Sequence, residues 1–151
     1  MSAQASAVDI LLVEDSPGDA RLTREAFKGC KLLNTLYHVE DGVEALAFLH
    51  RERPYGGVPR PGLILLDLNL PRMDGREVLA AIKQDEALKR IPVVVLTTSA
   101  DEQDVLRSYD LHANCFITKP VQLERFLRVV ESIEDFWLTI VRLPPRDSAP
   151  A

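Results

Sequence analysis

Acidic residues stand at the ends of two apolar runs in the sequence. The run ILLV stops at Glu14 and Asp15, and the run LILL stops at Asp67. Carboxylates brought together in this way repel one another and stay ionised only beside a cation or a lysine. Oxygen ligands of this kind, with space left for water, suit Mg²⁺. A metal ion beside one reactive carboxylate indicates phosphoryl transfer.

Short apolar runs alternate with segments of helical periodicity along the whole chain. We expect strands over residues 8–14, 35–40, 63–67, 91–98 and 113–118, and helices over residues 17–28, 42–52, 74–84, 101–110 and 121–140. Strands that are apolar throughout are typical of a parallel sheet covered on both faces, with right-handed helical crossovers. The pattern therefore predicts an α/β fold with an open, doubly wound sheet.

The predicted sheet gathers the polar residues at one place. All strands of a parallel sheet point the same way, so their carboxyl ends share one edge, where such folds bind ligands. That edge would carry Glu14 and Asp15 from the first strand and Asp67 from the third. It would also carry Thr97 from the fourth strand and Lys119 from the fifth.

Length and composition restrict the function further. A chain of 151 residues with 46% hydrophobic and 27% charged residues fits one globular domain. Its net charge of −5 argues against general binding to nucleic acid. The two cysteines fit neither a zinc site nor a disulfide framework, and we expect a reduced, cytoplasmic environment. The sequence contains no pattern of an export signal or of a membrane span.

Four ordered motifs give the chain a family resemblance. They are VED after the first strand, LLDLNLPRMDG at the third, LTTS at the fourth and FITKP at the fifth. With these motifs the chain resembles the receiver domain of bacterial two-component response regulators. The resemblance implies a flavodoxin-like, five-stranded sheet of order 2-1-3-4-5. We expect the receiver domain to span residues 8–143, with disordered ends at 1–7 and 144–151.

The resemblance also implies roles for individual residues. Asp67 would accept a phosphoryl group from a phosphohistidine of a sensor histidine kinase. Asp15, Asp67 and the backbone carbonyl of Asn69 would hold Mg²⁺ directly, and Glu14 would act mainly through water. Lys119 would help to neutralise the transferring group. The protein would be no enzyme beyond its own phosphotransfer and a slow self-dephosphorylation.

A conformational switch is implied in the same way. The hydroxyl of Thr97 can donate to a phosphoryl oxygen on Asp67, so phosphorylation should pull it inward. Phe116 resembles the aromatic residue that follows into the vacated space. Such a local hydrogen bond would bias a surface formed by the fourth helix, the fifth strand and the fifth helix.

The last predicted helix has more apolar surface than one core-facing stripe can bury. The segment FWLTIV, which contains Phe136, Trp137 and Ile140, is apolar almost all round. The segments SIEDFWLTIVRLP and YDLHANCFITKP resemble stand-alone regulators of bacterial phytochrome-type kinases, which are often dimers. We expect a homodimer through this helix and the fifth strand, with kinase contact alone or an intramolecular fold-back as the alternatives. No output domain is expected after the last helix.

The same residues argue against two other functions that a sheet of this kind can have. A flavodoxin-like flavin protein needs a phosphate cradle after the first strand, whereas EDSPGD would repel phosphate. A haloacid-dehalogenase-like phosphatase needs a second aspartate two residues beyond its nucleophile, where this chain has Asn69. A receiver-like scaffold that takes no phosphate remains as the main alternative.

Overall fold

A five-stranded parallel sheet forms the centre of the protein. The computed structural model describes residues 8–28, 34–97, 115–119, 122, 124–125 and 128. Its strands are β1 (Val8–Val13), β2 (Asn34–Val39), β3 (Leu63–Asp67), β4 (Val93–Thr97) and β5 (Cys115–Thr118). They lie in the order β2-β1-β3-β4-β5, and every neighbouring pair is parallel. The predicted fold class and strand order are confirmed.

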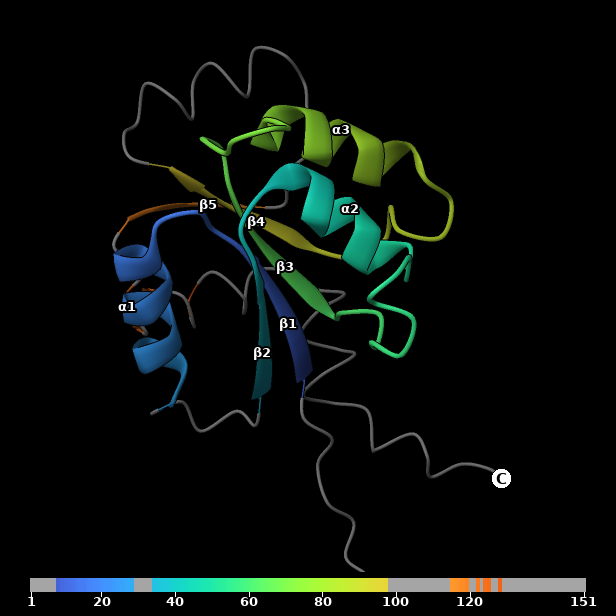
Figure 1. The fold of residues 1–151 in the computed structure, drawn as a ribbon. Helices are drawn as coiled ribbons and strands as arrows, with labels where there is room; N and C mark the ends of the chain where they lie inside the picture. Colours follow the sequence, from blue (N-terminus) through green and yellow to red (C-terminus); the bar gives the residue numbers. More distant parts are fainter. Residues whose placement is uncertain are drawn as a thin grey trace, which may run out of the picture.

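In the part of the chain that the structure describes with full helix bounds, three helices cover the two faces of the sheet. They are α1 (Pro17–Lys28), α2 (Gly42–Leu49) and α3 (Gly75–Gln84). Figure 1 shows α1 on one face and α2 with α3 on the other. The predicted helix over residues 101–110 lies outside the described residues, as does most of the helix predicted over 121–140. Among the described helices, none is long and apolar enough to cross a membrane.

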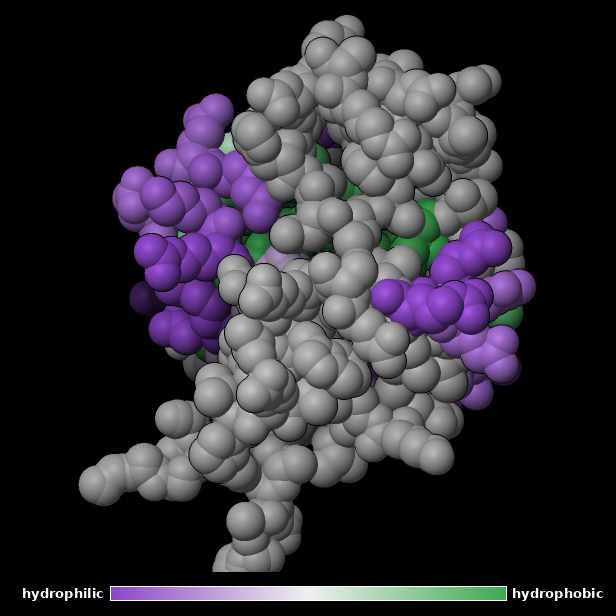
Figure 2. Space-filling view, turned by 180° about the vertical axis from the view of Figure 1, so that it is seen from behind, coloured by the Kyte–Doolittle hydropathy of each residue, from purple (hydrophilic) through white to green (hydrophobic). Residues whose placement is uncertain are grey.

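The strands divide their side chains between two hydrophobic clusters. In β1, Ile10 and Leu12 pack in the cluster that includes α1, while Leu11 and Val13 pack in the cluster that includes α2 and α3. Side chains along a strand point to opposite faces in turn, so both faces must be covered. This explains the unbroken apolar run of the central strand β3 up to Asp67. On its outer side α1 is hydrophilic, as seen from behind in Figure 2.

Local capping fixes the start of each helix. The backbone N–H of Asp19 donates to the hydroxyl of Ser16, which satisfies one of the free N–H groups at the start of α1. Asp41 caps α2 in the same way, and Asp74 forms a capping box with Glu77 at the start of α3. The sequence prediction placed these three helix starts within one residue.

The end of α2 differs from the prediction. The helix ends at Leu49 with His50 as its C-cap, whereas the periodicity predicts helix to residue 52. Arg51 has a φ of 56°, in the left-handed region that ends an α-helix. The loop that follows packs back on α2, because the ring of Tyr55 packs at a tilt against that of Phe48 and the Tyr55 hydroxyl donates a hydrogen bond to Glu44. This contact depends on the folded loop and not on local periodicity.

The segment between β3 and α3 is held close to the sheet. The backbone N–H of Gly75 donates to the carbonyl of Leu68 at 3.0 Å. A Cβ at Gly75 would lie 2.3 Å from the carbonyl oxygen of Asp67, so only glycine fits there without displacement. Arg72, with a φ of 64°, pairs with Asp41 at 3.0 Å and so ties this segment to the start of α2. The end of β3 is thus fixed by backbone contact and by a surface ion pair.

The replacement Gly75→Ala should destabilise the fold. The added methyl group has no space against the end of β3, and overpacking of this kind costs about 1–3 kcal/mol. Urea unfolding followed by circular dichroism measures the loss. Gly18→Ala is the matched control, because nothing lies within 4 Å of a Cβ at Gly18 in α1 and the free energy of unfolding should stay the same or rise. Equal stabilities of the two variants would contradict the close approach at Gly75.

Candidate functional site

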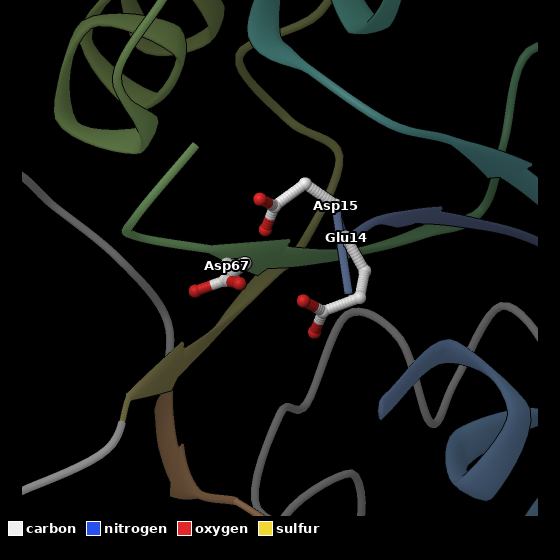
Figure 3. Close-up of side chains that lie close together, drawn as sticks. All are labelled: Glu14, Asp15 and Asp67. Carbon is white, nitrogen blue, oxygen red and sulfur yellow. The ribbon is translucent and has the colours of Figure 1, made fainter. Parts of the chain in front are cut away.

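Three carboxylates meet at the carboxyl ends of β1 and β3. Glu14, Asp15 and Asp67 each offer an oxygen atom, and these atoms lie within 4.8 Å of one another. Figure 3 shows the three side chains turned toward the same space. Glu14 and Asp67 are buried, whereas Asp15 is exposed. The carboxylate cluster predicted from the strand ends is therefore present.

Lys119 lies among these acids, directly after β5. Its Nζ atom is 3.0 Å from an oxygen of Asp67 and 3.0 Å from Oε1 of Glu14. It also lies 2.9 Å from an oxygen of Asp19, in the first turn of α1. One ammonium group thus faces carboxylates from β3, from the end of β1 and from α1. Its positive charge offsets the repulsion between the two buried acids.

The alternation of side chains along each strand explains why Lys119 and the two buried acids lie on the same face of the sheet. Glu14, Asp67 and Lys119 each lie two residues after a strand residue in the hydrophobic cluster that includes α1. These strand residues are Leu12, Leu65 and Ile117. Because strand side chains alternate with a period of two, the three polar side chains continue along the same face, just beyond the core.

The backbone satisfies some of the carboxylate oxygens. The N–H of Asn69 donates to Oδ1 of Asp67, and the N–H of Ser16 donates to Oε2 of Glu14. Oε1 of Glu14 is buried and accepts no hydrogen bond from the described part of the chain, and the ammonium group of Lys119 lies 3.0 Å from it as an ion pair. Three carboxylates with oxygen atoms this close together have the donor chemistry that suits a divalent cation.

The ionisation of the site follows from burial and charge. The pKa of Glu14 is raised to about 7, first by burial and then by the adjacent Asp67, against the opposing effect of Lys119. Burial alone would lower the pKa of Lys119, but hydrogen bonds with Asp19, Glu14 and Asp67 raise it above its ordinary value. Lys119 therefore stays charged at neutral pH, while Glu14 is the group in the cluster that gains a proton readily.

Some predicted residues cannot be compared with the structure. The backbone of Thr97 ends β4 at the same edge as Asp67, and Phe116 lies in β5 beside β4. The side chains of Thr97 and Phe116 lie outside the described part of the chain, so the switch stays a prediction. Phe136, Trp137 and Ile140, predicted for the dimer surface, also lie outside it.

Two residues of the site were missed by the sequence analysis. Asp19 binds Lys119, and His38 on β2 lies with Nε2 2.7 Å from the backbone carbonyl of Glu14, to which that nitrogen can only donate. Asp19 lies three residues after the helix cap Ser16, where an acid is read as a helix-start residue. The sequence contains no signal for His38, because a contact between neighbouring strands depends on their register.

Comparison with known proteins identifies the family. Residues 10–131 match the model of the response regulator receiver domain. The chain belongs to the response regulator receiver family. The resemblance noted from the four motifs is thus confirmed. A receiver domain is part of a response regulator and not a classical enzyme.

Similar receivers come from several signalling systems. The chain is 56% identical to response regulator Rcp1 of Synechocystis sp. over 135 residues, and these residues make up 89% of this chain and 92% of Rcp1. It is 44% identical to the probable methanogenesis regulatory protein FilR2 of Methanothrix harundinacea, over 89% of this chain and 86% of that protein.

Solved structures agree with the fold. The phosphorylated cyanobacterial phytochrome response regulator RcpA is 51% identical, with a TM-score of 0.73 over 93% of this chain and 99% of that one. The Mn²⁺-bound form of Rcp1 is 54% identical, with a TM-score of 0.72 over 91% and 99% of the two chains. Receivers of this family bind divalent metal, and the acidic cluster of this receiver is of the kind that does so.

Binding of a divalent cation to the receiver, tested with Mg²⁺, should strengthen as the pH rises. The raised pKa of Glu14, about 7, means that the free site holds a proton below this pH, and a bound cation favours the ionised form. The dissociation constant should fall by up to about tenfold per pH unit below pH 7 and level off above it. Calorimetric titration at several pH values measures this slope. Glu14→Gln removes the titrating group and should flatten the slope, and an equal slope in both proteins would contradict the role of Glu14.

Proposed function

We propose that Asp67 accepts a phosphoryl group from a phosphohistidine of a sensor histidine kinase. The observation that supports this most directly is the contact of Lys119 Nζ with Asp67 at 3.0 Å, beside a cluster of three carboxylates. An acceptor carboxylate needs a neighbouring positive charge, because phosphoryl transfer depends mainly on positioning and on neutralising the oxygens of the transferring group. Lys119 supplies one such charge.

The acidic cluster would hold Mg²⁺ for this reaction. Asp15, Asp67 and the backbone carbonyl of Asn69 would bind the ion directly, and Glu14 mainly through water. When bound, the ion neutralises charge on the phosphoryl oxygens. The oxygen chemistry of the cluster supports this choice of ligands.

The transfer involves Asp67, Lys119 and Thr97. One carboxylate oxygen of Asp67 forms a bond to phosphorus while the bond between phosphorus and the histidine nitrogen breaks, and that nitrogen keeps the electron pair. Lys119 and the Thr97 hydroxyl donate to phosphoryl oxygens. In the slow self-dephosphorylation, the oxygen of a water molecule forms a bond to phosphorus while the bond from phosphorus to Asp67 breaks. The water releases a proton to the solvent, and Asp67 leaves as a carboxylate.

The phosphorylated receiver would signal through a change of surface. Thr97 moves toward the phosphoryl group, and Phe116 fills the space that it leaves. This switch would change the affinity of the receiver for its partners. A homodimer through Phe136, Trp137 and Ile140 is the expected assembly, with the cytoplasm as its location. These parts of the proposal rest on the family and on the sequence.

The donor kinase is proposed to be of the phytochrome type. The similarity to Rcp1 and to RcpA, at 56% and 51% identity, supports this choice, since both identities extend over about nine-tenths of the chain. The similarity to FilR2, at 44% identity, points to a second signalling system but is lower. The receiver would then report the state of a light-sensing kinase.

Incubation with acetyl phosphate and Mg²⁺ tests the acceptor. Intact mass measurement should show the gain of one phosphoryl group, because the site can neutralise the transferring group without the kinase. Asp67→Asn should abolish the gain, since the amide oxygen is a poor nucleophile. Asp15→Asn keeps the acceptor but loses a ligand, and higher Mg²⁺ should partly restore its slow uptake. A chain that gains no phosphate would instead support the receiver-like scaffold.

Transfer from purified kinases tests the donor. The receiver should take labelled phosphate faster from an autophosphorylated phytochrome-type kinase than from a histidine kinase with a different sensor, because docking surfaces limit exchange between non-cognate pairs. The measurement is the rate of label transfer at equal kinase concentrations. Equal rates would remove the support for a phytochrome-type donor and leave the acceptor role unchanged.

A further inference from the structure

Asp19 is a fourth carboxylate at the site, and the proposed reaction does not use it. Its oxygen lies 2.9 Å from Nζ of Lys119, but it is not a member of the three-carboxylate cluster. The position of Asp19 follows from the start of α1, because its backbone N–H donates to the hydroxyl of Ser16. The helix cap thus places this carboxylate beside the lysine.

All the hydrogen-bond donors of Lys119 have a carboxylate acceptor. The ammonium group has three N–H bonds. They point to Oε2 of Glu14 at 3.2 Å, to Oδ2 of Asp19 at 2.9 Å and to Oδ2 of Asp67 at 3.0 Å. A phosphoryl oxygen can therefore receive a full hydrogen bond from Lys119 only if one of these carboxylates gives up its own.

Exposure to solvent decides which carboxylate is released most easily. The side chain of Glu14 is 0% exposed and that of Asp67 is 4% exposed, whereas that of Asp19 is 41% exposed. Asp67 itself carries the phosphoryl group after transfer, so the relevant comparison is between Glu14 and Asp19. A buried carboxylate left without a partner is strongly disfavoured, while a half-exposed one is solvated by water. Asp19 is the partner that water can replace.

We propose that Asp19 is a positioning residue that occupies one donor of Lys119 in the resting receiver and yields it to a phosphoryl oxygen. This inference rests on the proposed acceptor role of Asp67. The pair between Asp19 and Lys119 exists only before phosphorylation, so it stabilises the resting state. An interaction that exists only in the resting receiver lowers the affinity for a ligand, such as a phosphoryl analogue, that binds better to the other state. Asp19 therefore limits how strongly the site holds a phosphoryl group.

Binding of beryllofluoride, a phosphoryl analogue, with Mg²⁺ tests this role at equilibrium. Asp19→Asn keeps the shape of the side chain and removes its charge. The loss of a partly exposed ion pair should tighten binding about two- to fivefold, measured by calorimetry. Asp19→Glu restores the charge and should return the affinity toward that of the wild type. Unchanged or weaker binding by Asp19→Asn would overturn the proposal.

A matched control separates the contact from the net charge. Glu25 lies on the same helix and forms an exposed ion pair with Lys28, away from the acidic cluster. Glu25→Gln removes the same charge and should leave beryllofluoride affinity unchanged. If Glu25→Gln tightens binding as much as Asp19→Asn does, the effect is general electrostatics and the proposal fails. Asp19→Asn could also lower the free energy of unfolding, which urea unfolding measures, but a less stable protein would not bind beryllofluoride more tightly.

A double-mutant cycle tests whether Asp19 acts through Lys119. In a Lys119→Gln background, the change Asp19→Asn should have no further effect on beryllofluoride affinity. The same gain in both backgrounds would mean direct repulsion between Asp19 and the phosphoryl group, which contradicts the proposal. The behaviour of the wild type distinguishes failure of the acceptor role of Asp67 from failure of the role of Asp19. If the wild type gains no phosphate and binds no beryllofluoride, both the acceptor role of Asp67 and the role of Asp19 fail. If the wild type does both, and Asp19→Asn has the same beryllofluoride affinity as Glu25→Gln, only the role of Asp19 fails.

Discussion

The structure depends on one positive charge placed between two buried negative charges. Glu14 follows β1 and Asp67 ends β3, and burying these two like charges side by side would be costly without the ammonium group of Lys119. The lysine belongs to a distant part of the sequence, so only the complete sheet brings the charges together. Folding of the core and assembly of the site are therefore the same event.

The two-sided core gives this charge cluster its geometry. Alternation along the strands sends every second residue to the cluster that includes α1, and the buried acids and Lys119 continue that series past the strand ends. On the opposite face, α2 and α3 close the second cluster. The carboxyl edge of the sheet also holds Asp15, whose exposure keeps one side of the acidic cluster open to water and ions.

The segment between β3 and α3 links the site to the rest of the fold. It is held on one side by the close contact of Gly75 with the end of β3 and on the other by the pair of Arg72 with Asp41. The exposed ion pair contributes little by itself, but the backbone contact allows almost no displacement. Asp67, the proposed acceptor, is thus placed on a rigid strand end, while Asp19 stands on a half-exposed helix start, as the proposed exchange of its partner for water requires.

The sequence alone determined the sheet, its order through the family motifs, and the residues Glu14, Asp15, Asp67 and Lys119 of the site. Apolar strands that end in polar residues carry this information, because parallel strands must deliver their carboxyl ends to one edge. The tertiary structure decided the end of α2, which depends on the backbone of Arg51 and on a loop that packs back on the helix. It also decided the contacts of Asp19 and His38, since these need the distance between elements that no local pattern of residues encodes.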